Sequence, residues 1–222
     1  MIYEALNLTV LKTVSVPTGR VLDIGCGTGN LGAALKKQGA KEVVGITYSP
    51  EEGVAAGRKI DRVLVADLDI FVPPPDLGMF DVIVCSHVLE HLREPHRLLR
   101  LMHQHIAPTG VLIVALPNIL HWQRRLRFLF GDFTYTDGGL MDTTHLRFYT
   151  WATAQALIKE SMYDLCEARA DGHFPLPLLR RYLPVKLTAW LDQVSTRLIP
   201  GLFGSQFILL CRRRRTYPLI PV

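Results

Sequence analysis

The chain has 222 residues, of which 49% are hydrophobic, so it can bury a sizeable core and is not a disordered segment. Its 25 Lys and Arg residues outnumber its 20 Asp and Glu residues, which gives a net charge of +5, and basic residues gather at 124–127 and 212–215. We interpret the 212–215 run as the solvated end of a strand, with contact to nucleic acid or to an anionic membrane surface as the alternative.

The cysteines and the N-terminal segment indicate a cytoplasmic protein. Cysteine occurs at four positions, in or beside apolar runs and without CxxC spacing: Cys26, Cys85, Cys166 and Cys211. We expect reduced thiols in the core, with neither a disulfide nor a zinc framework. The first ten residues carry Glu4 and lack a basic start, so we expect no signal peptide. Because no stretch reaches about 18 uninterrupted apolar residues, we expect no membrane span.

Strands and helices alternate along the first half of the chain. Residues 2–14 predict a short helix over one edge of the domain, and the segment 17–19 breaks the chain before the first strand. The expected strands cover 21–24, 43–46, 62–66, 80–85 and 111–115, and the expected helices cover 31–38, a segment that begins at Ser49-Pro50, and 89–101. This alternation is typical of a doubly wound, mostly parallel α/β sheet with helices on both faces.

The second half is less regular. Thr150 is expected to cap a helix that ends at Glu160, and strands are expected at 163–170 and 205–211, which brings the sheet to seven strands. A proline-punctuated insertion before the last strand, 174–200, contains a predicted helix at 185–198. We predict one domain over residues 1–222.

An apolar and basic helix is expected within 118–137, with Trp122, Leu126 and Leu129 on one face. It admits three interpretations: a lid over an acceptor pocket, a helix lying on a membrane surface, or an ordinary amphipathic helix that faces the core.

One turn is expected to lie bare against a ligand. The apolar strand at 21–24 is followed by Gly25, Gly27 and Gly29, and a helical pattern begins directly afterwards. This layout lets backbone groups approach a ligand closely. The segment 27–32 also spells GxGxxG, the dinucleotide fingerprint. However, the turn already begins at Gly25, and no Asp or Glu ends the second strand to hold a ribose hydroxyl, so a nicotinamide cofactor is the weaker alternative.

Polar residues gather where the predicted strands end. The carboxyl ends of parallel strands share one edge of the sheet, which is where sheets of this class bind ligands. The residues at these ends are Gly25, Thr47, Asp67, Ser86, His87 and Asn118.

The motif Asp23-x-Gly25-x-Gly27-x-Gly29 resembles motif I of class I S-adenosylmethionine (SAM) methyltransferases. In that family the glycine turn approaches the amino-acid end and the ribose of SAM, and the acid steadies the turn and the methionine ammonium. Ala66-Asp67-Leu68 resembles the motif whose acid contacts the adenine. The resemblance implies a Rossmann-like SAM-binding core over about 19–118 and an acceptor or lid region over about 119–204. The cofactor-binding residues that it implies are Asp23, Gly25, Cys26, Gly27, Gly29, Thr47, Tyr48, Asp67, Leu68 and Ser86.

Further segments resemble narrower groups. Residues 80–91 resemble the post-strand-four motif of the ubiquinone-biosynthesis O-methyltransferase group, and residues 117–126 resemble the small MetW-like proteins. The block Asp142–Thr150 resembles a block in bacterial methyltransferases often associated with cell-surface glycan or secondary metabolism. These likenesses indicate a subgroup and name no substrate.

Thr47 departs from the family pattern, because most relatives have Asp or Glu there to grip both ribose hydroxyls. A threonine offers one neutral hydrogen bond in place of a charge-assisted pair, a loss of about 1 kcal/mol or more. Some methyltransferases of the tocopherol and cyclopropane-fatty-acid kind also have Thr here, and Glu51 or Glu52 is positioned in sequence to compensate.

Two histidines are the catalytic candidates. Methyl transfer to a hydroxyl needs a positioned nucleophile and the removal of its proton, and histidine suits the second task near neutral pH. His87 follows strand four, where the resemblance places the reaction centre, and His145 lies in the later block. For either residue the alternative is a hydrogen-bonded pocket histidine that moves no proton.

The triplet His87-x-x-Glu90-His91 spaces three potential metal ligands along one helical face. Some relatives, including a small-RNA methyltransferase, bind a divalent ion with a glutamate–glutamate–histidine version of it. Because Glu-His is also common in relatives without a metal, we assign no metal ligand. We expect Glu90 and His91 to start the helix and to contact Arg93 or Arg97.

We therefore predict transfer of a methyl group from SAM to a small-molecule acceptor at a hydroxyl oxygen, with S-adenosylhomocysteine (SAH) as product. The alternatives are a SAM-binding partner or regulatory protein of the MetW-like kind, and a methyltransferase for a sugar, lipid or nucleic-acid acceptor. We expect a monomer or homodimer without a nucleic-acid partner, and leave contact with a membrane surface open.

Overall fold

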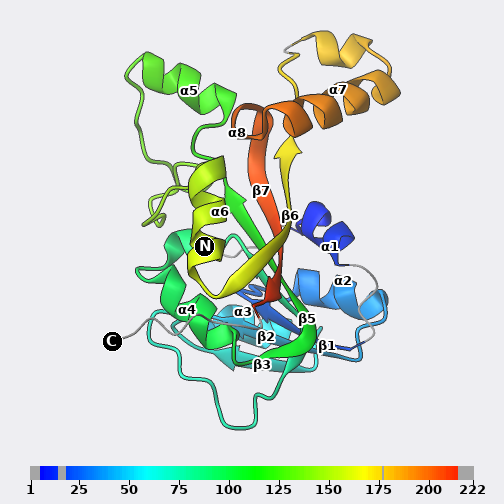
Figure 1. Cartoon of the computed structure of the whole chain (residues 1–222), viewed down its shortest axis with the longest axis vertical. Helices are drawn as coiled ribbons and strands as arrows, with labels where there is room; N and C mark the ends of the chain where they lie inside the picture. The colour runs from blue at the N-terminus through cyan, green and yellow to red at the C-terminus, as the bar shows by residue number, and fades with distance from the viewer. Residues whose placement is uncertain (1–5, 15–18, 177, 215–222) are drawn as a thin grey trace.

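The computed structural model describes residues 6–14, 19–176 and 178–214. Seven strands of these ranges form one sheet in the order β3-β2-β1-β4-β5-β7-β6 (Figure 1). The strands are β1 (Arg20–Ile24), β2 (Glu42–Thr47), β3 (Arg62–Val65), β4 (Phe80–Ser86), β5 (Ile106–Pro117), β6 (Tyr163–Gly172) and β7 (Gly204–Arg213). The first five run parallel, and β7 is antiparallel to both of its neighbours. The predicted fold class is confirmed.

Successive residues of β1 face opposite layers of the molecule. Val21 packs with Leu35 in one core and Leu22 packs with Leu99 in the other. The helices on the Val21 side are α1 (Leu8–Thr13), α2 (Asn30–Lys37) and α3 (Pro50–Ala56), and those on the Leu22 side are α4 (Pro95–Met102) and α6 (Trp151–Glu160). Burial on both faces explains why the sequence of β1 is nearly all apolar.

The predicted helix over one edge lies elsewhere. α1 packs against β5 and β7, which are inside the sheet, because Val10 belongs to the core on that face. Residues 2–5 of the predicted helix, the break at 17–18 and Arg215 lie outside the described residues.

The single helix predicted at 89–101 is wrong. A short 3₁₀ helix, η1 (Leu89–His91), is followed by a break and then by α4. Pro95 causes the break, because a proline disfavours helical backbone in the residue before it, and Glu94 has φ −128° and ψ 73°. Glu90 and His91 therefore sit on a tight turn at the rim of the sheet.

The described residues of the second half form four further helical elements: α5 (Trp122–Leu129), η2 (Leu179–Tyr182), α7 (Val185–Leu198) and α8 (Pro200–Phe203). α6 begins after the Thr150 cap and ends at Glu160 as predicted, and α7 has its predicted bounds. α5 and α7 project beyond the ends of β6 and β7 at one end of the molecule (Figure 1). α5, all of whose residues are described, contains no buried residue, so its core-facing interpretation is wrong.

Three of the four cysteines are buried free thiols, as predicted. Cys166 is exposed, because it lies on the edge strand β6 beside a break in the pairing register between Leu165 and Glu167. Among the described residues, no helix combines the length and the apolarity needed to cross a bilayer.

Candidate active site

The pairing register brings three strand ends together. Ile24 is opposite Ile46 of β2 and Cys85 of β4, so the residues that follow these strands share one rim of the sheet. The rim thus contains the glycine turn after β1, Thr47 at the end of β2 and Ser86 at the end of β4. These residues of the predicted cofactor site are neighbours in space.

The glycine turn has the backbone that the motif requires. Gly25, Gly27 and Gly29 have φ values of 71°, 51° and 78°, in the left-handed region that favours glycine. A Cβ on Gly25 would lie 2.3 Å from Cγ2 of Val88, and one on Gly29 would lie 3.0 Å from Cα of Ala56. The turn is therefore closely packed against the segment after β4 and against α3.

Cys26 points away from the rim. Its side chain is buried, and burial raises the pKa of its thiol to about 12. A Cβ added to Gly45 would lie 2.6 Å from its Sγ, so the thiol packs beneath the turn against β2. Its backbone N–H donates to the carbonyl of Ile46, which ties the turn to β2.

Asp23 is a buried carboxyl group beneath the turn. Only 2% of the residue is exposed, and its Oδ2 receives no hydrogen bond from any residue that the structure describes. Burial raises the pKa of Asp23 to about 7, and a backbone hydrogen bond from Gly32 opposes the rise. The hydroxyl of Thr28 in the turn also has no partner within the described ranges. Buried polar atoms without partners are costly, so the turn is incomplete as it stands.

Thr47 occupies the position of the usual ribose-binding acid, but the structure places a carboxylate beside it. The Thr47 hydroxyl donates to Oε2 of Glu52 across 2.8 Å, and both residues are buried. Glu52 lies in the first turn of α3, where the hydroxyl of Ser49 accepts from its backbone N–H. The acid missing from the end of β2 is thus replaced in space by one from the next helix. Sequence alone offered Glu51 and Glu52 equally, but Glu51 turns outward to Ser49.

The residues predicted around the adenine and ribose line the outer part of the rim. The backbone N–H of Ala66 donates to the Thr47 carbonyl, which places the segment after β3 beside the end of β2. Asp67 is exposed and accepts from the backbone N–H of Asp69, and Leu68 is half-buried. Tyr48 is 76% exposed, so its ring is available for stacking on a ligand.

His87 lies on the same rim with left-handed backbone, φ 55°. Its Nδ1 is 3.2 Å from Oε1 of Glu90, and its Nε2 is 2.9 Å from Oε1 of Gln206. Burial lowers the pKa of His87, but the hydrogen bond and the charge of Glu90 outweigh it and raise the pKa overall. Both ring nitrogens face oxygen acceptors, which suits a protonated ring better than a base.

A polar network beside His87 was missed from the sequence. The Gln206 amide donates to Asp171, which also accepts from Thr9. Asn7, the N-cap of α1, donates to both Gln206 and Ser86. The one available signal was topological: because β7 runs antiparallel, its first residues lie at the rim where the parallel strands end.

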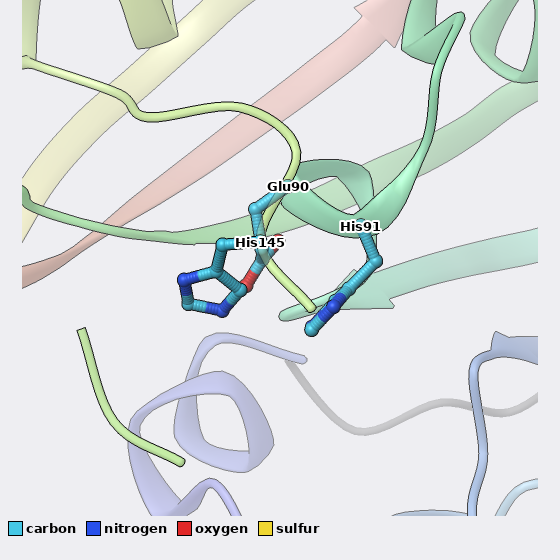
Figure 2. Close-up of side chains that lie close together, drawn as sticks. All are labelled: Glu90, His91 and His145. Carbon is cyan, nitrogen blue, oxygen red and sulfur yellow. The ribbon is translucent and has the colours of Figure 1, made fainter. Parts of the chain in front are cut away.

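His145 joins Glu90 and His91 rather than His87. Figure 2 shows these three side chains directed toward one another, His145 from the 142–150 segment and the other two from η1. The imidazole rings of His91 and His145 meet edge to face, with centroids 4.7 Å apart. Burial lowers the pKa of His145, which favours the neutral ring. Arg97 was one of the two arginines expected to contact Glu90 and His91. Its guanidinium donates to the backbone carbonyls of Asp69 and Phe71.

Asn118 has a structural position. It is fully buried, and its amide donates to the carbonyls of Gly201 and Gly204, which joins the end of β5 to the start of β7. Its side-chain oxygen Oδ1 accepts from the backbone N–H of Leu120. It closes the fold at the rim and offers nothing to a ligand.

Comparison with known proteins fixes the family. A family model described as a methyltransferase domain matches residues 4–161, most of the chain. The chain belongs to this family, that of the class I SAM-dependent methyltransferases. The expected family and its cofactor SAM are thus confirmed.

Two curated relatives with different names each match about half of this chain. The ubiquinone biosynthesis O-methyltransferase of Xylella fastidiosa (strain M23) is 34% identical over 116 residues, which cover 49% of this chain and 46% of that protein. The ribosomal protein L11 methyltransferase of Vibrio vulnificus (strain CMCP6) is 31% identical over 126 residues, 54% of this chain and 43% of that protein. The chain therefore spans about half the length of the curated relatives it matches.

A solved SAM-dependent methyltransferase from Mesorhizobium loti has the same fold. It superposes with a TM-score of 0.63 at 19% identity, covering 95% of this chain and 99% of that one.

Proposed function

We propose that the chain transfers a methyl group from SAM to a hydroxyl oxygen of a small-molecule acceptor. The observation that carries this proposal is the rim itself, where a left-handed glycine turn, a buried Asp23 oxygen with no partner among the described residues, and the Thr47–Glu52 pair lie at neighbouring strand ends. When bound, SAM supplies an activated methyl group that an acceptor oxygen can take up.

Different residues of the rim would contact different parts of SAM. Asp23 lies under the turn, where its carboxylate would stabilise the turn and the ammonium of the methionine part. Glu52, steadied by the Thr47 hydroxyl, would accept hydrogen bonds from the ribose hydroxyls. Asp67, Leu68 and Tyr48 would border the adenine and the ribose. The chemistry of these residues fits SAM. The cationic ammonium of its methionine part would meet the Asp23 carboxylate, and its two ribose hydroxyls would meet the Glu52 carboxylate.

His87 and Ser86 come next on the rim, toward the acceptor. Ser86 is held by Asn7, and His87 by Glu90 and Gln206, so both are fixed before an acceptor arrives. Fixed polar groups orient a nucleophile and exclude other poses. We assign His87 this orienting role, because both of its nitrogens already face acceptors. Its role as a base stays a prediction.

The class of acceptor is inferred from the relatives' names and from the segment after β4. The named relatives include one that is called an O-methyltransferase and another that is called a methyltransferase of a ribosomal protein, at similar identity. These names therefore favour no single class of acceptor. The small-molecule proposal rests on the polar, histidine-rich segment after β4, which offers hydrogen bonds to a hydroxyl.

Calorimetry and a methyl-transfer screen test the proposal. SAH and SAM should bind, and NADH should not. Binding of NADH would favour the nicotinamide-cofactor interpretation of the glycine turn. A screen over phenols, sugars and carboxylates with labelled SAM should then find label on a hydroxyl compound. SAH binding with no transfer to any acceptor class would support the SAM-binding partner instead.

A further inference from the structure

A groove lies between α5 and the 131–141 segment, which turns back along this helix. Its volume is about 410 Å³. The residues that line it are Trp122, Gln123, Arg124, Leu126, Arg127 and Leu140. Hydrogen bonds hold both ends of α5. At the start, the Arg125 guanidinium donates to the carbonyls of Leu120 and Gly201, and at the end the Asp132 backbone N–H donates to the carbonyl of Arg127.

Two nitrogens of the groove lining have no acceptor. Nη1 of Arg124 and Nε1 of Trp122 are buried, and neither has a hydrogen-bond partner among the residues that the structure describes. Both groups can donate a hydrogen bond and cannot accept one. A buried donor without an acceptor is costly, and a charged one costs more than a neutral one. A ligand that accepts hydrogen bonds would remove this cost.

The charge of the groove indicates what that ligand is. Arg124 and Arg127 lie three residues apart on α5 and so share one face of the helix. Nη1 of Arg127 is 3.7 Å from Oδ2 of Asp132, and 58% of the arginine side chain is exposed. Two guanidinium groups against one carboxylate leave a positive charge among these three side chains. Guanidinium groups bind carboxylate and phosphate groups through paired hydrogen bonds, so the groove fits an anion of this kind.

A row of aromatic side chains runs from α5 to η1. It begins at Phe128, next to Arg127, which stacks on Phe133 with ring centroids 5.1 Å apart. Phe133 meets Phe148 edge to face, and Phe148 meets His145, the histidine beside η1. Phe133 is 54% exposed, so the row offers apolar surface to a ligand. It leads from the groove toward the segment that follows His87.

We propose that the groove binds an anionic group, a phosphate or a carboxylate, of an acceptor whose apolar part lies along the aromatic row. This inference rests on the proposed function, because it places the acceptor hydroxyl at His87. Arg124 and Trp122 would donate to the anion, and the aromatic rings would cover the apolar part. Binding requires the long Arg124 side chain to turn toward the groove, a rotamer change of the kind that is common at binding sites.

The acceptor class is therefore a hydroxyl compound that is both apolar and anionic. The headgroup of a membrane lipid offers the same anionic chemistry as a soluble acceptor. We favour the soluble acceptor, because the aromatic row continues from α5 inward to η1, beside the proposed reaction centre.

Calorimetry with octyl phosphate on the full chain tests the groove without SAM. We expect one site per chain, binding of inorganic phosphate that is about tenfold weaker, and no binding of uncharged octyl glucoside. Arg124→Gln should weaken octyl phosphate binding about tenfold, and Trp122→Phe, which keeps an aromatic ring and loses the donor, about threefold. Arg100→Gln is the matched control, because it removes the same charge from an exposed position on α4, away from α5 (Figure 1), and it should leave binding unchanged.

The outcomes separate this site from the proposed function. Absence of octyl phosphate binding, or equal binding in Arg124→Gln and the parent, would overturn the site even if SAH binds normally. Thermal melts and an unchanged SAH affinity check that Arg124→Gln folds. Binding to phosphatidylglycerol vesicles, but not to octyl phosphate or phosphatidylcholine vesicles, would assign the anion to a membrane lipid and overturn the acceptor site.

The methyl-transfer screen tests the role of the groove in acceptor binding. For phosphorylated or carboxylated hydroxyl compounds, Arg124→Gln should raise KM about tenfold and leave kcat nearly unchanged, because the anion is held away from the reacting atoms. KM for uncharged hydroxyl compounds should stay the same. Equal effects on charged and uncharged acceptors would overturn this role. Octyl phosphate binding with no transfer to any acceptor would refute the proposed function and leave only an anion site.

Discussion

The cofactor rim and the outer helices are built on different principles. At the rim, Asp23, Thr47 and Glu52 are all at least 90% buried and are held by strand register and helix capping. At the end of α5, Leu129 and the capping residue Phe130 are 78% and 79% exposed, and no strand fixes their position. The difference teaches that the rim is fixed by buried contacts within the protein itself. The α5 region, which we expect to meet the acceptor, exposes apolar side chains that another molecule would cover.

The largest effect is expected at the glycine turn. Gly27→Val should abolish SAH binding in calorimetry, because a β-branched residue is strained at φ 51° and its side chain fills the space of the proposed backbone contact. Gly131→Val is the matched control: Gly131 has φ 77° and open space where its Cβ would stand, so the same strain arises far from the rim. Unchanged SAH affinity in Gly27→Val, or equal losses in both variants, would refute the site.

Glu52→Gln should weaken SAH binding roughly tenfold, or about 1.4 kcal/mol, since the ribose loses a charge-assisted partner. Its neighbour Glu51, which turns outward to Ser49, provides the control variant Glu51→Gln. Calorimetry on the two variants distinguishes the carboxylate beside Thr47 from a general effect of charge on α3. If both variants bind SAH with the same affinity, Thr47 holds the ribose without help from the Glu52 carboxylate.

The position of the strand ends at this rim was predictable from the sequence. The glycine turn and the strand ends lie at one edge of the sheet as predicted, because parallel strands bring their carboxyl ends to the same edge. Glu52 was only one of two choices, since the direction of a helical side chain depends on packing that a sequence does not display. His145 and Gln206 could not be placed, because each reaches its partners through pairing between distant segments. The single helix predicted at 89–101 is wrong because Pro95 interrupts it.

A smaller effect should come from pH. The pKa of Asp23 is raised to about 7 in the free protein, so the folded state holds the proton more tightly than the unfolded chain. Stability should therefore fall as pH rises from about 4 to 7. A ligand ammonium prefers the carboxylate form, so SAH affinity should rise about threefold between about pH 6.5 and 7.5, with net proton release. Calorimetry in buffers of different ionisation enthalpy measures that release, and Asp23→Asn should lose it.

The smallest effect is expected on α5. Leu129→Ser should change the free energy of unfolding by less than about 0.5 kcal/mol, because the side chain is 78% exposed. Leu99→Ala, on the fully buried face of α4, should cost about 2–5 kcal/mol by the same denaturant titration. SAH affinity should be the same in Leu129→Ser and the parent, while transfer to an apolar acceptor, or binding to anionic vesicles, should fall. A large loss of stability in Leu129→Ser would mean that α5 packs on the protein in solution, and the contrast between the two regions would disappear.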